Sequence, residues 1–173
     1  ILTIAAATEN AAPVNGNPIT RNIMEYGAFP DGTRDNTAIF QQALDATAAV
    51  NGGIVEVPSG RYRFDGSITI PSNVTLRGTF TYSPAHAGIR DGNSKQNPVY
   101  GSVLEPVGNA DNEEETPFIT VQGNATLQGF TIHYPEQKPD AEAPTPYPYA
   151  VAMRGNNPAL IDMQLLNPYK GID

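Results

Sequence analysis

The sequence contains no cysteine and no long hydrophobic run. The absence of cysteine excludes disulfides and thiolate metal sites, but it fits a bacterial secreted protein as well as a cytosolic one. The apolar stretches fall far short of the roughly 18 consecutive residues that a membrane helix requires. We therefore expect neither membrane insertion nor a cysteine-bound metal.

Basic residues are also scarce: the 173 residues include 10 Lys and Arg against 18 Asp and Glu, for a formal net charge of −8. Because the basic residues form no cluster that could follow a phosphate backbone, we do not expect nucleic acid as a partner. The charge balance also disfavours a polyanionic substrate, unless a cation such as Ca²⁺ bridges the carboxylates. A neutral polysaccharide or oligosaccharide is the simpler expectation.

Glycine and proline, by contrast, are abundant, with 16 of each. Both residues interrupt regular structure, so the sequence predicts short elements, mainly β-strands joined by loops. The length and the 39% hydrophobic content suffice for one domain with a core. Residues 1–20 are small, polar and aperiodic, which predicts an N-terminal lead-in and leaves residues 21–173 as the domain.

One segment, residues 36–50, has a helical period with its apolar side chains on one face. Asp35 is placed to accept hydrogen bonds from the first free backbone N–H groups. Gly52 and Gly53 let the backbone leave the last turn. After this helix the pattern predicts short strands with tight turns at 54–57, 61–64 and 68–70.

A degenerate repeat runs through the rest of the chain, in which an apolar strand precedes a turn asparagine and, three residues later, a leucine. Its three copies carry Asn73 and Leu76, Asn124 and Leu127, and Asn157 and Leu160. The repeat is typical of a parallel β-helix, whose coils return their strands about 4.8 Å above the previous ones. The unequal spacing predicts loops that leave the stack at about 81–102 and 134–149.

Such a stack needs a cover at its ends, because open parallel strands pair with other chains. The helix at 36–50 is expected to cover the first coil. No similar element follows the last repeat, and the sequence stops at Asp173, where a coil is just beginning. We therefore expect a stack that is incomplete at its C-terminal end and that downstream coils or another chain complete.

Two runs resemble the opening of the pectate-lyase-like β-helix superfamily: residues 26–39, YGAFPDGTRDNTAI, and residues 52–62, GGIVEVPSGRY. Asn36 stands where a second aspartate is more usual, a change that is expected to preserve hydrogen bonding at the helix N-terminus. The resemblance implies a mainly β protein, a right-handed parallel β-helix with one N-terminal capping α-helix. Polysaccharide lyases, glycoside hydrolases, epimerase-like proteins and phage tailspikes all use this opening, so it does not choose among them.

Cleavage of a glycosidic bond by hydrolysis needs two carboxyls, about 5 Å apart for retention or about 6.5 to 9.5 Å apart for inversion. Asp173 is the candidate catalytic carboxylate, with an ordinary turn aspartate as the alternative interpretation. Its partners would come from a coil outside this sequence. The catalytic centre is therefore expected to lie largely outside this chain.

Elimination by a lyase instead needs a base near C5 of a uronate, usually Lys or Arg in this superfamily, and a cation. Arg154 is the candidate base, and a structural ion pair is its alternative role. Lys170, the other basic residue of the later coils, is assigned to substrate binding. Ca²⁺ is the one cofactor this route implies, and residues 113–115, three glutamates, could join its site or form a solvated loop.

Sugar rings stack on aromatic faces, so the tyrosines in and after the 134–149 loop are candidates for a subsite wall, with packing of the loop as the alternative. Glu136 in the same loop could bind a sugar hydroxyl. His133 and His86 have no second ligand at a useful spacing and are interpreted as surface or structural groups. The candidate tyrosines are Tyr134, Tyr147, Tyr149 and Tyr169.

Together these observations predict a secreted or cell-surface enzyme that degrades a polysaccharide. The acidic charge and the few Lys and Arg residues favour a glycoside hydrolase over a lyase that acts on a uronate-containing glycan. A non-catalytic, tailspike-like glycan-binding adhesin is the alternative from another class. No metal site is predicted unless the protein is a lyase.

Overall fold

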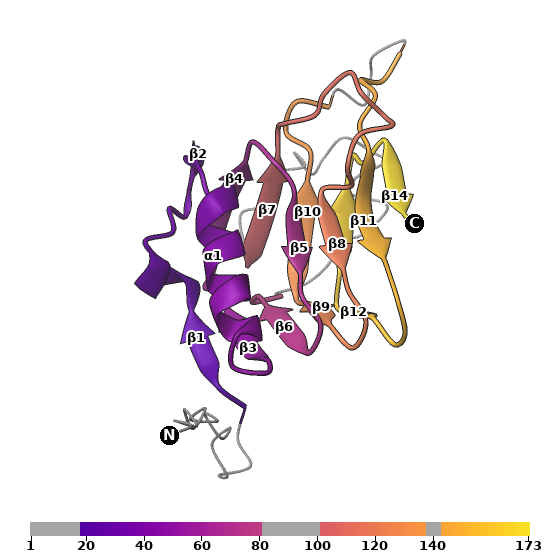
Figure 1. Ribbon diagram of the computed structural model, residues 1–173. Helices are drawn as coiled ribbons and strands as arrows, with labels where there is room; N and C mark the ends of the chain where they lie inside the picture. The colour runs from indigo at the N-terminus through magenta and orange to yellow at the C-terminus, as the bar shows by residue number, and fades with distance from the viewer. Residues whose placement is uncertain (1–17, 81–100, 138–142) are drawn as a thin grey trace, which may run out of the picture.

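The computed structural model describes residues 18–80, 101–137 and 143–173, and it shows coils stacked along one axis, whose strands form three parallel sheets around that axis (Figure 1). Sheet A contains β1 (Thr20–Asn22), β3 (Gly53–Glu56), β6 (Val74–Arg77), β9 (Thr126–Gln128) and β12 (Ala159–Ile161). Sheet B contains β2 (Asp31–Asp35), β4 (Gly60–Phe64), β7 (Ser102–Pro106), β10 (Phe130–His133) and β13 (Gln164–Leu166). Sheet C contains β5 (Ile68–Ile70), β8 (Ile119–Val121), β11 (Tyr149–Met153) and β14 (Lys170–Ile172).

The chain visits the sheets in a fixed order, B, then C, then A, before it returns to B one level further along the stack. Every strand pair is parallel, and each strand lies beside the strand of the neighbouring coil. Parallel neighbours need a crossover connection, and here the two other sheets of each coil provide it. The predicted right-handed parallel β-helix is confirmed.

The asparagine repeat aligns along the stack, as the sequence predicted. Leu76, Leu127 and Leu160 are Cα partners in sheet A, so they form one column, and the first two of these side chains are fully buried. The asparagine three residues before each leucine has a left-handed backbone, with φ of 65°, 58° and 57°. Asparagine tolerates this conformation better than most residues, which explains why it recurs at this turn.

The predicted helix is α1, which spans Thr37–Ala48 and buries Phe40, Ala43, Leu44 and Thr47. Its start is as predicted: Asp35 accepts hydrogen bonds from the backbone N–H and the hydroxyl of Thr37. The helix ends before residue 50, because the backbone turns left-handed at Asn51. The expected range of 36–50 was therefore slightly too long.

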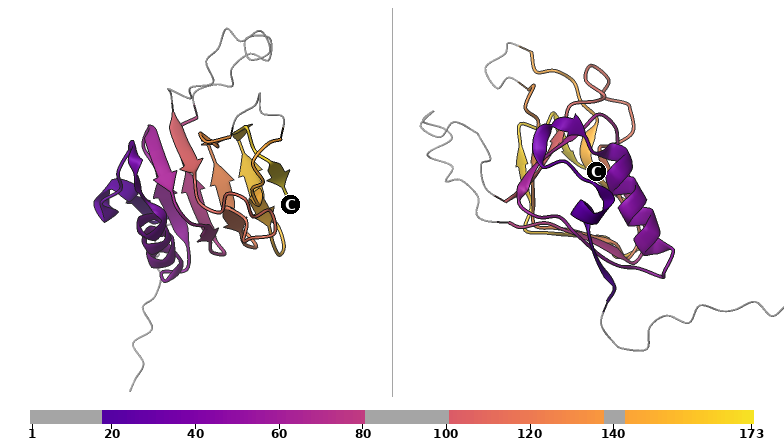
Figure 2. Two further views of the ribbon diagram at one scale, coloured as in Figure 1. Left: turned by 90° about the horizontal axis from the view of Figure 1, so that it is seen from above. Right: turned by 90° about the vertical axis from the view of Figure 1, so that its left-hand side faces the viewer.

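The helix covers the start of the stack in a way that the sequence did not predict. α1 packs against β5 and takes the place that a strand of sheet C would have in the first coil. In the view along the stack it forms one side of the outline that the strands trace (Figure 2, right). The short helix η1 (Ile23–Tyr26) lies within that outline, and its Ile23 is fully buried. The cover is thus shared between α1 and η1.

Asn36 has a different role from the one expected, because its side chain makes no capping bond to the helix. It is fully buried, its Oδ1 accepts from the N–H of Phe29 at 2.8 Å, and its Nδ2 donates to three backbone carbonyls. Those carbonyls belong to Phe29 (3.1 Å), Arg34 (2.9 Å) and Arg63 (3.3 Å). The amide therefore joins the opening loop to strand β4, and a carboxylate could not make the bonds that Nδ2 donates.

We expect Asn36→Asp to lower the free energy of unfolding by about 1 to 3 kcal/mol, because a carboxylate has no N–H to offer the three carbonyls. Urea unfolding followed by circular dichroism measures this. Asn22→Asp is the matched control, since the Asn22 side chain only accepts a bond, from the N–H of Met24 at 2.9 Å. Equal stability of the two variants would contradict the assigned role of Asn36.

The two expected loops are placed in part. Residues 81–100 and 138–142 lie outside the described residues, and Ser102 already belongs to β7. Tyr149 was predicted to end the second loop, but it is the first residue of strand β11. The buried side chain of Gln137 closes the base of that loop by bonding the backbone of Thr145 at 2.8 and 2.9 Å.

At the other end of the stack, β12, β13 and β14 are edge strands of the three sheets. Ile172 in β14 is 52% exposed, although it continues the inward column of Val151. Completion of the stack by further coils or by another chain stays a prediction. Within the described parts of the chain, no helix has the length and apolar character needed to cross a membrane.

Candidate functional site

The two residues predicted as catalytic, Arg154 and Asp173, lie together after strands β11 and β14. Nη2 of Arg154 forms an ion pair with Oδ2 of Asp173. Their side chains are 46% and 43% exposed, so the pair is solvated. This geometry is the structural ion pair that was the alternative for Arg154, and a catalytic role for either residue stays a prediction.

Lys170, predicted to bind substrate, is engaged by the acidic run of the loop before β8. Its Nζ lies 3.1 Å from Oε2 of Glu113 and 3.3 Å from Oε1 of Glu114, and 5.4 Å above the ring of Tyr149. The hydrogen bond that Lys170 donates to Glu113 is the main cause that raises the pKa of Lys170. In the described part of the chain, no group of three or more Asp, Glu or His side chains converges to hold a metal ion. The calcium expectation for a lyase stays a prediction.

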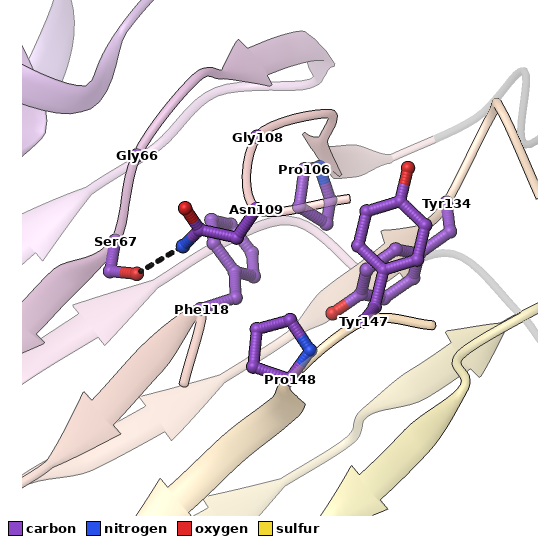
Figure 3. A pocket seen from close by; sticks show the side chains of 9 residues that line it. All are labelled: Gly66, Ser67, Pro106, Gly108, Asn109, Phe118, Tyr134, Tyr147 and Pro148. Atoms are coloured by element: carbon purple, nitrogen blue, oxygen red, sulfur yellow. Dashed lines mark hydrogen bonds between the residues drawn. The ribbon is translucent and has the colours of Figure 1, made fainter. Parts of the chain in front are cut away.

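The predicted aromatic wall divides into buried and accessible rings. Tyr134 and Tyr147 are each 1% exposed and pack edge to face at 4.9 Å, around a small cavity that Figure 3 shows from close by. Burial raises the pKa of both phenols, and their hydroxyls have no hydrogen-bond partner among the described residues. Neither ring offers a face to a sugar here, because both are enclosed. Tyr169 is 38% exposed and Tyr149 is half-buried, so these two rings remain candidates.

A second group of polar side chains lies on the outer face of sheet B, where β4, β7 and β10 run side by side (Figure 1). Tyr62, Leu104 and Ile132 point into the core at one level of this sheet. Side chains alternate along a strand, so their neighbours Glu105 and His133 face outward. We call Arg61, Glu105 and His133 the Glu105 cluster.

The Glu105 cluster is joined by hydrogen bonds to one carboxylate oxygen. Oε1 of Glu105 accepts from Nε and Nη2 of Arg61 at 3.0 and 2.6 Å, and it lies 3.2 Å from Nδ1 of His133. The Glu105 side chain is 2% exposed, that of His133 10% and that of Arg61 44%. The cluster therefore runs from a buried carboxylate to a guanidinium at the surface.

Two opposing effects act on the Glu105 carboxyl. Burial by itself raises its pKa, but the hydrogen bonds from His133 and Arg61 and the charge of Arg61 outweigh it, so the pKa is held below its ordinary value. Glu105 is thus ionised at neutral pH. Gly32 in β2 leaves room for this carboxylate, because a Cβ at Gly32 would lie 3.1 Å from its second oxygen.

Other polar side chains extend the same face. Arg63 pairs with Asp65 at 2.8 Å, and this bond chiefly, with a smaller effect from the charge of Glu136, raises the pKa of Arg63. Glu136, predicted to bind a hydroxyl, is exposed. An imidazole can transfer protons near neutral pH, and guanidinium groups bind carboxylates. The outer face of sheet B thus combines a largely buried imidazole with two partly exposed guanidinium groups.

Sequence reasoning missed this site, because His133 was interpreted as isolated. His133 and Glu105 are 28 residues apart, and no motif links them. The sequence did contain one indication. Glu105 directly follows Leu104, and His133 directly follows Ile132, and these two core residues occupy equivalent positions near the ends of adjacent strands. Residues at equivalent positions of adjacent coils lie about 4.8 Å apart, so the two side chains meet once the coils are in register.

Comparison with known proteins agrees with the fold. Mannuronan C5-epimerase AlgE6 of Azotobacter vinelandii is 31% identical over 133 residues, which cover 70% of this chain and 15% of the epimerase. Alginate lyase 7 of the same organism is 41% identical over 64 residues, which cover 33% of this chain and 8% of the lyase. The chain thus spans only a small part of the length of these relatives.

A solved structure and a family profile extend the comparison. The tailspike protein gp49 of Acinetobacter baumannii bacteriophage Fri1, a capsular polysaccharide depolymerase, superposes with a TM-score of 0.56 at 17% identity, and the match covers 89% of this chain and 27% of the tailspike. At this identity the likeness shows the fold alone. The profile described as rhamnogalacturonase A/epimerase, pectate lyase-like, matches residues 20–145. Since this match includes most of the chain, the protein belongs to the pectate lyase-like family of rhamnogalacturonase A and epimerases.

Proposed function

We propose that this chain is part of an enzyme that modifies a uronate-containing polysaccharide, and that the outer face of sheet B binds the polymer. In this proposal His133 transfers a proton to or from C5 of a uronate unit. The observation that carries it is the Glu105 cluster, which holds an imidazole beside a guanidinium on one face. The names of the two Azotobacter relatives, a mannuronan C5-epimerase and an alginate lyase, support this substrate class.

The proposed chemistry begins with removal of the proton at C5, next to the carboxylate of the sugar. A nearby cation favours this step, because negative charge moves onto that carboxylate as the proton leaves. Arg61 and Arg63 are suited to this role, since both lie on strand β4 and alternate with the inward Tyr62, which places them on the same face of sheet B as Glu105. Loss of the group linked at C4 would complete an elimination, whereas return of the proton to the other face would complete an epimerisation.

The net charge of −8 favoured a neutral glycan, but local charge matters more than net charge at a binding face. Arg61 and Arg63 are 44% and 39% exposed, so solvent and a polymer can reach both guanidinium groups. Each forms an ion pair with a neighbouring carboxylate, which a uronate would have to share. This is why we prefer the lyase or epimerase chemistry to the hydrolase expected from composition.

Hydrolysis is the second candidate, favoured by the carboxylates around Arg63. Asp65 is 49% exposed, and the exposed Glu136 acts on the same guanidinium through its charge. Two accessible carboxylates on one face are what a glycoside hydrolase requires. The family description, which includes a rhamnogalacturonase, is compatible with this alternative.

The test is to incubate the protein in D₂O with polymannuronate, polygalacturonate, rhamnogalacturonan and a neutral glucan, with Ca²⁺ or with a chelator. Deuterium at C5, or products with the ultraviolet absorbance of an unsaturated uronide, would support the proposal. New reducing ends without either signal would support hydrolysis instead. Binding without any chemical change would overturn both and favour a glycan-binding adhesin. A secreted or cell-surface location stays a prediction.

A further inference from the structure

The hydrogen bond between Glu105 and His133 indicates which nitrogen of the imidazole carries the proton. An ionised carboxylate can only accept hydrogen bonds, and Oε1 of Glu105 lies 3.2 Å from Nδ1 of His133. For a bond to form at this distance, Nδ1 must carry the proton. A neutral imidazole has a single N–H, so its Nε2 is then left with a free lone pair.

We propose that Glu105 is a positioning residue that fixes His133 in the Nδ1-protonated tautomer and so makes Nε2 the atom that exchanges a proton with the substrate. The second half of this statement rests on the proposed function. The first half does not, because the tautomer is a property of the free protein. A carboxylate that orients an imidazole in this way occurs in unrelated acid–base sites.

Two neighbours keep the Glu105 carboxylate available for this role. Nε and Nη2 of Arg61 both donate to Oε1, the oxygen that also faces His133. The Glu105 side chain is only 2% exposed, and these two bonds compensate the cost of burying its negative charge. Gly32 has φ of 70° and leaves space beside the other oxygen. Arg61 and Gly32 belong to the first two strands of sheet B, whereas His133 belongs to the fourth, so the stack itself assembles the group.

The tautomer can be read directly by ¹⁵N NMR of the protein labelled at histidine, at a pH where His133 is neutral. The sequence has two histidines, and His86→Gln assigns the signals. We expect a protonated Nδ1 and an unprotonated Nε2 in His133. The opposite pattern, or an equal mixture of tautomers, would overturn the proposal.

A variant tests the cause. In Glu105→Gln we expect the His133 tautomers to mix, because a side-chain amide can either donate or accept. Glu56→Gln is the matched control: Glu56 also pairs with an arginine, Arg77, but on sheet A. Circular dichroism checks that both variants fold; if Glu105→Gln does not, the measurement on the unmodified protein decides alone. An unchanged tautomer in folded Glu105→Gln would count against positioning by Glu105.

Kinetic measurements on Glu105→Gln distinguish the positioning role of Glu105 from the proposed function of the protein. On a polymer that the unmodified protein modifies, Glu105→Gln should lower kcat by about 10- to 100-fold with a similar KM, because the misplaced proton affects the chemical step more than binding. An unchanged kcat would overturn the positioning role. If no polymer is modified, the proposed function fails, and the tautomer assignment is still decided by the NMR result.

Discussion

Replacing His133 by glutamine is expected to lower the rate of polysaccharide modification by about 10²- to 10⁴-fold, the range for loss of a general acid–base group. Glutamine has nearly the reach of histidine and can still donate to Oε1 of Glu105, so the buried carboxylate keeps a partner. What the variant loses is an imidazole, which can both accept and release a proton, whereas a side-chain amide cannot. Initial rates with the best uronate polymer, measured at several pH values, provide the comparison.

The control for this prediction is Gln128→Ala, which removes a polar side chain from sheet A. It should leave the rate within about twofold, because sheet A has no part in the proposed site. Thermal unfolding of both variants separates lost activity from lost structure. If His133→Gln retained full activity while folded, His133 could not be the acid–base group, and Asp65, Glu136 and the Arg154–Asp173 pair would be tested next.

Replacing Phe64 by alanine is expected to lower the free energy of unfolding by about 3 to 5 kcal/mol, as is typical for a buried phenylalanine. Phe64 is fully buried and packs edge to face between Phe40 of α1, at 4.9 Å, and Phe118, at 5.1 Å. The substitution leaves a cavity between helix α1, strand β4 and the segment just before strand β8. It therefore loses contacts with both the cover of the stack and the stack itself.

Urea unfolding monitored by circular dichroism gives the midpoint and slope for Phe64→Ala and the unmodified protein. Val50→Ala is the control, since Val50 lies just after α1 and is 36% exposed. Its effect should stay within about 0.5 kcal/mol, as for most surface substitutions. A loss below about 1 kcal/mol in Phe64→Ala would mean that the neighbouring rings repack to fill the space.

Local signals in the sequence were sufficient for the elements. The 3.6-residue period gave helix α1 its buried face, and Asp35 marked its start. The asparagine turns at 73, 124 and 157 were predicted correctly because a left-handed backbone is a local property that asparagine tolerates. Even the unequal spacing was informative, since insertions between coils leave the stack undisturbed.

Contacts between coils could not be predicted in the same way. Tyr134 and Tyr147 were expected to contact sugar, yet both rings are buried, because each meets the other across the base of the loop. Asn36 was assigned to the helix N-terminus, but its amide bonds carbonyls of a loop and a neighbouring strand. Polar and aromatic side chains have several possible partners, and the sequence does not rank them.

The sequence by itself determined the architecture, a mainly β stack of parallel coils with a helix at its N-terminal end, through its periodicity, its turn residues and its opening motif. Only the tertiary structure decided which side chains meet on its surface. Glu105 and His133 come together because strands β7 and β10 of two neighbouring coils are in register, and Arg61 joins them from strand β4 of a third coil. Which side chains lie next to each other on adjacent coils depends on the register between those coils. Packing of the shared core fixes this register, and no single segment of the sequence contains that core.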